Sequence, residues 1–408
     1  MRRVVITGAG VVSPLGSSPD GVWEKVSTAT SGIGPLTRLK LNSGRAHVAG
    51  EVRDYAPEQH FQPKDLELLD RFAQFAIVAA RAAVADARFK LTNGNSVRTG
   101  VSIGSAYGGM ESYDSSYRLL YGENAQRMHP LTIPRLMHNA ATSHVSMYLG
   151  AKGPSLCVST ACASSSHAIG EAFRTIQAGA ADVMLAGGSD APLTLGVLKC
   201  WEAMRVLAGA GSDARAACRP FSADREGMVI SEGATVLVLE EYQEARRRDA
   251  RIYAEIVGYG STADSGHITQ PTVEGPARAM QLAIQEAELC SHQVDYINAH
   301  GTGTKMNDVT ETRAIHEVFK EHAGHLSVSS SKSMHGHLMG ASGAMELLIT
   351  VLAIQNGVAP PTANYRQPDP ECDLDYTPNE KRERPIHAAL SNSFAFGGLN
   401  AVLAVRRL

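Results

Sequence analysis

Cys162 is the residue whose surroundings best suit nucleophilic chemistry. A β-forming stretch near Val158 runs into Ala- and Ser-rich sequence that becomes a helix around Glu171–Gln177, which places Cys162 at or near a helix N-terminus. The helix dipole and the unpaired backbone N–H groups there stabilise a thiolate and lower the thiol pKa. The same N–H groups can hold the oxyanion of an attacked carbonyl. Taken alone, the pattern fits a buried structural cysteine equally well.

A second candidate segment carries a histidine and two threonines. His300, Thr302 and Thr304 lie in a glycine-containing loop, residues 298–304, which follows an apolar strand. In α/β proteins, sites usually lie where strands end, so this loop is a natural place for a working histidine. The two threonine hydroxyls offer donors and acceptors to a polar, uncharged ligand.

Two further segments gather reactive groups in small-residue sequence. Residues 329–343 bring Lys332, His335 and His337 to a point just before a helix, and residues 392–398 form a glycine loop flanked by aromatic side chains. A lone histidine is more often a satisfied core residue, and His335 with His337 could be taken for a metal pair. Metal hydrolysis would want an additional carboxylate at ligand spacing, which we do not find. Four such loops together predict one active site.

The elements that must position these loops alternate along the chain. Short Val-, Ile- and Leu-rich strands alternate with Ala-rich helices, which predicts an α/β protein with largely parallel sheets. We divide the chain at about residue 250 into two loosely similar halves, 1–250 with the cysteine and 251–408 with the two histidines. The predicted strands are Val4–Ile6, Val183–Ala186, Ala234–Leu239, Ile252–Val257, Val294–Ile297, Leu326–Val328, Ala388–Leu390 and Val402–Val405. The predicted helices are Phe72–Asp86, Glu241–Arg248, Ala277–Glu288 and an apolar helix after Gly343.

The bulk composition excludes several classes of function. The formal charge of the 408 residues is -3, so no global field draws the chain to nucleic acid or to a membrane surface. Six cysteines without paired spacing indicate reduced thiols in the cytoplasm. The apolar start reads as a strand and not as a signal peptide, and Leu347–Ile354 is too short to cross a bilayer. The Gly8-Ala9-Gly10 turn expected after the first strand lacks the third glycine of a dinucleotide site, where Ser13 stands.

Taken together, these segments resemble the β-ketoacyl-acyl carrier protein synthases, in particular the elongating type II enzymes and the ketosynthases of related polyketide pathways. The resemblance runs from Val4–Gly8 to Asn392–Gly398. It implies a thiolase-like α/β fold of five αβαβα layers, built from two similar halves and acting as a homodimer or as a heterodimer with a related subunit. It also implies decarboxylative condensation of malonyl-acyl carrier protein with a cysteine-bound acyl chain. No cofactor is expected, because the substrates travel on the 4′-phosphopantetheine of the carrier protein.

The resemblance assigns a role to each catalytic candidate. Cys162 accepts the acyl chain, and two imidazole N–H donors from His300 and His337 stabilise the enolate that decarboxylation leaves. Initiating synthases carry Asn in place of one histidine, so the pair favours elongation. Lys332 is expected to orient His337 or the neighbouring Glu311. The backbone N–H groups of Cys162 and Phe396 form the oxyanion hole, and Phe396 is also the gating aromatic.

Other assignments come from the resemblance alone. The expected substrate-binding residues are Tyr107, Trp201, His267, Thr269, Thr302, Thr304, Phe394 and Phe396. Lys64, Arg127 and Arg205 are expected to dock the carrier protein. Asn298, Glu346, Ser391 and Asn392 match a buried monovalent-cation site of some relatives.

The chain departs from the family pattern mainly around the substrate. Tyr107 stands where elongating enzymes commonly have an aliphatic residue at the far end of the acyl channel, so it shortens the pocket or offers a polar handle. Ala395 replaces a usual glycine in the gating loop, Leu399 a usual threonine, and Glu67 a residue that is often basic. These departures favour a dedicated pathway over housekeeping fatty acid synthesis.

Two other classes of protein were weighed against an active ketosynthase. A non-catalytic partner subunit, such as a chain-length factor, usually lacks the nucleophile, whereas Cys162, His300 and His337 are all present. A degradative thiolase would want a second cysteine near the C-terminal glycine loop, where Phe394 and Phe396 stand instead.

Overall fold

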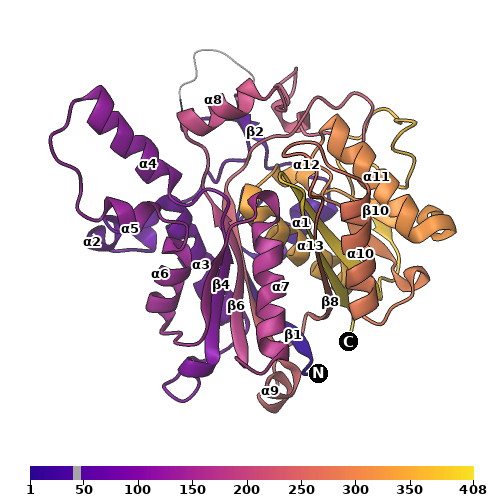
Figure 1. Cartoon of the computed structure of the whole chain (residues 1–408), viewed down its shortest axis with the longest axis horizontal. Helices are drawn as coiled ribbons and strands as arrows, with labels where there is room; N and C mark the ends of the chain where they lie inside the picture. Colours follow the sequence, from indigo (N-terminus) through magenta and orange to yellow (C-terminus); the bar gives the residue numbers. More distant parts are fainter. Residues whose placement is uncertain (40–46) are drawn as a thin grey trace.

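The main sheet is built twice from the same strand pattern. The computed structural model describes residues 1–39 and 47–408, and its largest sheet has the order β10-β9-β13-β14-β8-β1-β7-β6-β4-β5 (Figure 1). The strands of the first half are β1 (Val4–Val12), β4 (Thr99–Gly104), β5 (Ser155–Val158), β6 (Val183–Asp190) and β7 (Gly233–Glu241). Those of the second are β8 (Ala254–Ala263), β9 (Tyr296–Asn298), β10 (Ser327–Ser329), β13 (Ala388–Ala395) and β14 (Leu399–Arg406).

The remaining elements are helices and two small ribbons. The ribbons are β2 (Gly34–Pro35) with β3 (Val48–Ala49), and β11 (Val358–Ala359) with β12 (Arg382–Glu383). The helices of the first half are α1 (Pro19–Ser27), α2 (Pro63–Leu66), α3 (Arg71–Asp86), α4 (Met110–Tyr117), α5 (Thr132–Leu136), α6 (Ala140–Leu149), α7 (Ser164–Gln177), α8 (Leu195–Ala203) and α9 (Tyr242–Arg247). Those of the second are α10 (Glu274–Glu286), α11 (Lys305–Phe319), α12 (Lys332–His335) and α13 (Ser342–Asn356).

The prediction of largely parallel sheets was wrong, because each half is mixed. In the first half β4 pairs in parallel with β5 and β6, whereas β7 runs antiparallel between β6 and β1. The second half repeats this arrangement with β9, β10, β13, β14 and β8. Helices cover both faces of such a sheet, so its strands are apolar throughout whichever way they run, and the sequence pattern does not report direction.

The halves meet at β1 and β8, and both have a glycine in a strand at the point where a helix packs closely against it. Val4–Ile6 of β1 pairs antiparallel with Ala254–Ile256 of β8. A Cβ added at Gly10 would overlap the backbone oxygen of Ala79 in α3, and one added at Gly260 would overlap that of Ala279 in α10. Glycine is therefore needed where a helix backbone crosses a strand closely. The expected turn at Gly8–Gly10 does not exist, since both glycines lie inside β1.

Three helical layers and the two half-sheets make five layers. Helices α3 and α6 pack on the outer face of the first half-sheet, α10 and α11 on the outer face of the second, and α7 and α13 lie between them. In α13 every residue from Ser342 to Ile354 is buried, which fits a helix that is apolar on all sides. Figure 1 shows α7 running alongside β4 and β6, with α3 and α6 to the left and α10 and α11 to the right.

Two further observations concern a projecting arm and the length of the helices. Helices α4 and α5 project from the body as an arm at the left of Figure 1. Among residues 1–39 and 47–408, no helix is both long and apolar enough to span a membrane.

Candidate active site

Cys162 lies on a sharp turn between a strand and a helix. β5 ends at Val158, a single 3₁₀ turn covers Ala161–Ala163, and α7 begins at Ser164. Ala161 has a φ of 49°, in the left-handed region that non-glycine residues rarely adopt. The sequence therefore located Cys162 correctly beside a helix N-terminus, and the strained turn presents its thiol at the end of a cavity.

The three predicted catalytic side chains meet although they come from distant segments. Sγ of Cys162 and a ring nitrogen from each of His300 and His337 lie within 4.8 Å of one another. The two imidazole rings are 5.5 Å apart and nearly perpendicular, at 83°. All three residues line one cavity of about 600 Å³ that opens at the surface.

Hydrogen bonds fix the tautomer of His337. The backbone N–H of Met339 donates to its Nδ1 at 3.1 Å, so Nδ1 is an acceptor, and the Ser342 hydroxyl lies 2.8 Å from the same atom. A neutral imidazole that accepts at Nδ1 carries its hydrogen on Nε2. In the described chain Nε2 of His337 is buried without a partner, so this donor is free to bind a substrate oxygen.

Lys332 fixes the tautomer of His300. Its ammonium lies 3.3 Å from Nδ1 of His300 and donates to the His300 carbonyl at 2.6 Å. It also forms a fully buried ion pair with Glu346. An ammonium can only donate, so Nδ1 of His300 accepts and Nε2 carries the hydrogen. We expected Lys332 to orient His337 or Glu311. This was wrong, because the Lys332 side chain points to His300 and Glu346.

Glu311 holds the His300 loop from the other side. Its carboxylate accepts from the backbone N–H groups of His300 and Gly301, each at 2.8 Å, and from Nδ2 of Asn392 at 3.1 Å. The loop is thus fixed between a carboxylate and an ammonium. Both groups are buried, so each depends on these hydrogen bonds and ion pairs to replace the water it has lost.

The surroundings keep both histidines neutral. Burial lowers the pKa of His300 and of His337 well below the ordinary 6.5, and the Lys332 ammonium lowers both further. Burial raises the pKa of Cys162 to about 11, although Lys332 and the backbone N–H of Phe396 oppose this rise. The lowered thiol pKa expected from the helix terminus was therefore wrong, since desolvation outweighs the helix.

The backbone N–H groups of Phe396 and Cys162 both lie near the Cys162 sulfur and lower its pKa, and their role as an oxyanion hole stays a prediction. One Cys and two His could also hold a metal ion, which would need a lone pair on each ligand nitrogen. Here Nδ1 of each ring already accepts a hydrogen bond and Nε2 carries the hydrogen, so neither ring offers a lone pair to the cavity. The arrangement is therefore one of hydrogen-bond donors, suited to a developing negative charge.

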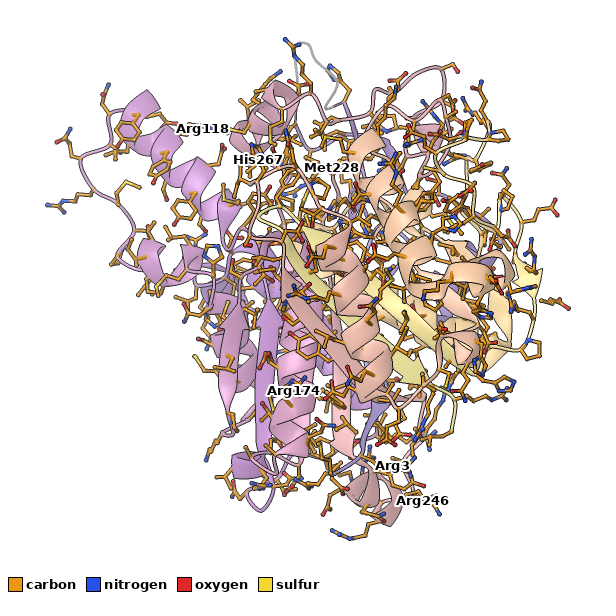
Figure 2. The ribbon with its side chains drawn as sticks, turned by 45° about the vertical axis from the view of Figure 1, so that its right-hand side comes forward. Arg3, Arg118, Arg174, Met228, Arg246 and His267 are labelled. Atoms are coloured by element: carbon orange, nitrogen blue, oxygen red, sulfur yellow. The ribbon has the colours of Figure 1, made fainter. Side chains whose placement is uncertain are left out.

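The cavity brings together most of the expected substrate-binding residues. Its wall includes Trp201, Arg205, His267, Thr269, Thr302, Thr304, Phe394 and Phe396. Thr302 and Thr304 bond to each other through their hydroxyls at 2.9 Å. Figure 2 shows His267 and Met228, another lining residue, at the same end of the molecule. Tyr107 is absent from this wall, and the exposed Lys64 and Arg127 lie away from the cavity.

The four residues matched to a cation site share a structural property. In the described chain Oδ1 of Asn298, Oε2 of Glu346, Oγ of Ser391 and Oδ1 of Asn392 are all buried without a hydrogen-bond partner. Asn298 and Ser391 are neighbours across the β9–β13 pair. Buried oxygens without donors are costly, and hard cations prefer oxygen ligands. These residues therefore fit a monovalent cation.

Sequence reasoning missed several residues that hold the site together. Asp264 and Asn400 link the gating loop to the cavity wall, since Asn400 donates to Asp264 at 2.7 Å and Asp264 N–H donates to Gly398 at 2.9 Å. Asp190 accepts from Ser105, Ala106, Tyr107 and Gly340. Asp190 ends a buried strand, and a carboxylate at that place was a usable signal.

Comparison with known proteins identifies the family. The model of the beta-ketoacyl synthase N-terminal domain matches residues 1–245, and that of the C-terminal domain matches residues 253–366. The chain belongs to the β-ketoacyl synthase family. It is accordingly an acyltransferase that forms carbon–carbon bonds, with a thiolase-like fold.

Individual relatives of this β-ketoacyl synthase match it over its whole length. Nodulation protein E of Rhizobium sp. (strain N33) is 48% identical over 407 residues, which are 100% of each chain. The 3-oxoacyl-[acyl-carrier-protein] synthase 2 of Staphylococcus aureus (strain N315) is 45% identical over 100% of this chain and 98% of that protein. Among solved structures, AntDE:AntF is a type II PKS acyl-carrier protein in complex with its ketosynthase bound to the hexaketide. It has a TM-score of 0.91 and 33% identity, and covers 100% of this chain and 99% of that one.

Proposed function

We propose that this β-ketoacyl synthase extends an acyl chain on Cys162 by two carbons taken from malonyl-acyl carrier protein. The observation that carries the proposal is the pair of Nε2–H donors of His300 and His337, which share one cavity with Cys162. Two donors beside a thiol suit a reaction in which an enolate oxygen forms next to a thioester.

In the first half-reaction the acyl chain moves to Cys162. The thiol sulfur attacks the carbonyl carbon of an acyl thioester on the phosphopantetheine arm. The backbone N–H groups of Cys162 and Phe396 hold the resulting oxyanion. The carbon–sulfur bond to the carrier breaks, and the proton of the Cys162 thiol passes to the departing pantetheine thiolate.

In the second half-reaction malonyl-acyl carrier protein loses carbon dioxide. The electron pair of the broken bond forms an enolate, whose oxygen binds Nε2–H of His300 and His337. The enolate carbon attacks the acyl-cysteine carbonyl and expels the Cys162 thiolate. That thiolate takes a proton from water, which its pKa of about 11 favours, and the thiol is restored.

The carrier protein, the oligomer and the cellular site are parts of the same proposal. Arg205 lies exposed at the cavity mouth beside Lys305, where an acidic carrier protein can dock, with Lys64 and Arg127 as more distant contacts. The enzyme acts in the cytoplasm on substrates that carry 4′-phosphopantetheine and needs no other cofactor. Its halves, residues 1–250 and 251–408, contribute the nucleophile and the two histidines respectively.

A second copy of the chain completes the molecule in this proposal. β5 is an edge strand of the sheet, and Leu156 on it is 49% exposed. Tyr121 and Ile133 of the adjoining arm are 75% and 61% exposed. An open strand edge and exposed large apolar side chains are both hazards unless another chain covers them. A homodimer paired at β5 covers both; a related subunit would do the same in a heterodimer.

The monovalent cation also belongs to the proposed enzyme. Asn298, Glu346, Ser391 and Asn392 would hold it, and its charge would compensate the Glu346 and Glu311 carboxylates beneath the His300 loop. In that place it steadies the loop and takes no part in bond making.

A dedicated pathway is the second candidate, favoured by one observation. Tyr107 is partly buried, and its hydroxyl accepts a hydrogen bond from Trp201 in the cavity wall, which is unusual for an enzyme that takes long hydrocarbon chains. Its relatives include nodulation protein E and a type II PKS ketosynthase, besides the synthase of S. aureus. In this reading the condensation is the same and the acyl chain is specialised.

A condensation assay tests the proposed function. Purified protein is mixed with malonyl-acyl carrier protein and acyl carrier proteins of graded chain length, beside a Cys162→Ala variant. We expect a 3-oxoacyl product that is two carbons longer and absent with the variant. A product formed equally by Cys162→Ala would contradict the proposal. A product confined to one chain class would favour the dedicated pathway.

A further inference from the structure

Behind the cavity wall lies a hydrogen-bonded pair of aromatic side chains. Nε1 of Trp201, on α8, donates to the hydroxyl of Tyr107 at 2.6 Å. The Trp201 ring also stacks on Phe396, with ring centres 5.8 Å apart and planes 29° from parallel. Trp201 and Phe396 line the cavity and Tyr107 does not. The Tyr107 hydroxyl therefore lies directly behind Trp201, and an acyl chain that extends from Cys162 past the Trp201 ring meets it.

Tyr107 is held firmly in this position. Its backbone N–H donates to the buried Asp190 carboxylate at 3.1 Å, and the neighbouring Ala106 N–H and Ser105 hydroxyl donate to it at 3.0 and 2.7 Å. Its ring belongs to an apolar cluster with Leu198 and Met339. The backbone at Tyr107 is thus fixed by Asp190, and the side chain is held by the Trp201 hydrogen bond and by its packing on this cluster.

The phenol keeps a hydrogen to donate. Burial raises the pKa of Tyr107 above its ordinary value, and the nearby Cys162 and Asp190 add to the rise, so the hydroxyl stays protonated. In residues 1–39 and 47–408 no acceptor takes this hydrogen, because the one hydrogen bond of the hydroxyl is accepted from Trp201. The indole N–H of Trp201 is therefore already used, whereas the hydroxyl hydrogen of Tyr107 is free to bind an acceptor.

These contacts discriminate between chemical classes of acyl chain. A saturated chain that separates Trp201 from Tyr107 covers the indole N–H and the hydroxyl, both already partly buried, with hydrocarbon, so that each loses its partner. A chain with a keto or hydroxyl oxygen at the same depth can accept from both groups. Sites whose polar groups pair with a substrate oxygen reject the analogue that lacks it.

We propose that Tyr107 and Trp201 form a polar filter that selects acyl chains carrying a keto or hydroxyl oxygen over saturated chains of the same length. The filter rests on the proposed condensing function, because it acts on the chain that Cys162 carries. Tyr107 and Trp201 are specificity-determining residues in this account and take no part in bond making. Short chains that end before the pair are not discriminated.

The test compares loading of Cys162 by matched thioesters. The probes are octanoyl pantetheine and hydroxyoctanoyl pantetheines with the hydroxyl on successive carbons, and the readout is the rate of acyl addition by intact mass. For the wild type we expect at least one hydroxyoctanoyl isomer to load about 10-fold faster than octanoyl. In Tyr107→Phe and in Trp201→Phe that ratio falls toward one. Two variants are used so that a folding failure of either leaves the other informative.

Two control variants test whether the effect is specific to Tyr107 and Trp201. Trp23→Phe and Tyr242→Phe remove the other tryptophan and a tyrosine at the far end of the molecule, where Figure 2 shows its neighbours Arg3 and Arg246. Both should keep the wild-type ratio. Equal loading of octanoyl and every hydroxy isomer by the wild type, or an unchanged ratio in both pair variants, would overturn the filter. No loading of Cys162 by any probe would instead count against the proposed condensing function.

Discussion

Nζ of Lys332 lies 2.6 Å from the carbonyl oxygen of His300 and 3.3 Å from its ring Nδ1. One ammonium therefore fixes the loop backbone, the ring orientation and the tautomer of a proposed catalytic histidine. The negative partner of Lys332 is Glu346, on the buried helix α13. The active site consequently depends on a charge pair in the centre of the protein.

Replacing Lys332 should separate stability from catalysis. Burial raises the pKa of Glu346 to about 7 even beside Lys332, so in Lys332→Met the carboxyl loses its cation and must either take up a proton or stay unpaired, which costs up to about 3–5 kcal/mol of unfolding free energy. Adding Glu346→Gln removes this unpaired carboxyl group and recovers part of the stability. Decarboxylation of malonyl-acyl carrier protein should stay low in both variants, because neither orients His300. Chemical denaturation and carbon dioxide release measure the two effects; wild-type decarboxylation by the double variant would show that Lys332 is only structural.

The two histidine donors should matter for decarboxylation and much less for acyl loading. His300→Ala or His337→Ala removes one Nε2–H donor and should lower decarboxylation about 10²–10³-fold, while Cys162 still accepts an acyl group. The wild-type rate should not fall as the pH drops through 6.5, since burial and Lys332 keep the pKa of both rings well below that value. His335→Asn is the control, because His335 is buried nearby but does not line the cavity. A loss with His335→Asn as large as with the other two, per folded molecule, would contradict the assignment.

The Cys162 thiol should react slowly at neutral pH. The thiolate is the reactive form, and burial raises the pKa of Cys162 to about 11. The fraction of thiolate, and with it the rate of alkylation by iodoacetamide, should therefore rise about tenfold per unit between about pH 7 and pH 10. Peptide mass mapping separates Cys162 from the exposed Cys200 and Cys290. A rate that levels off near neutral pH would mean that the helix N-terminus outweighs desolvation.

Potassium should stabilise the fold by binding the unpartnered side-chain oxygens of Asn298, Glu346, Ser391 and Asn392. Replacing a bulky organic cation by potassium in the buffer should raise the thermal midpoint by about 2 °C or more, because a ligand that binds only the folded state stabilises it. Ser391→Ala should abolish this difference. Ser393→Ala, two residues further along β13, should keep it, since the Ser393 hydroxyl pairs with Ser166. Equal thermal midpoints in both salts for the wild type would show that these residues do not bind potassium.

A charge on the edge strand should break the proposed dimer. Leu156→Lys places an ammonium at the β5 edge, where charged side chains oppose strand pairing. Light scattering after size-exclusion chromatography should then report a monomer in place of a dimer. Leu282→Lys, on the outer face of α10, is the control and should remain dimeric. A wild-type monomer, or a Leu156→Lys dimer, would show that the copies do not pair at β5.

Much of the fold followed from sequence because its elements are strongly patterned. The Ala-rich helix predicted at Phe72–Asp86 is α3, and the apolar helix predicted after Gly343 is α13. Strand direction could not be predicted, since strands covered on both faces look alike. The turn predicted at Gly8–Gly10 was wrong for a related reason. Whether a glycine marks a turn or a close helix contact depends on residues that are distant in sequence.

At the site, residue types and loops were predictable and long-range partners were not. Cys162, His300 and His337 meet as expected: Cys162 precedes α7, His300 follows β9, and His337 lies in the turn between α12 and α13. The partner of Lys332 is decided by the packing of α13, which no local pattern reports. The thiol pKa depends on how tightly the finished fold excludes water, and a helix terminus alone does not determine that balance.

The most direct test of the account is a two-step mass measurement on the wild type and Cys162→Ala. An acyl carrier protein is added first, and the protein is weighed; malonyl-acyl carrier protein is added next, and the protein, the carbon dioxide and the product are measured together. We predict an acyl adduct on Cys162 of the wild type alone, which disappears in the second step as one carbon dioxide and one 3-oxoacyl chain appear for each adduct lost. An adduct that persists, or carbon dioxide released without any carbon–carbon product, would contradict the condensation.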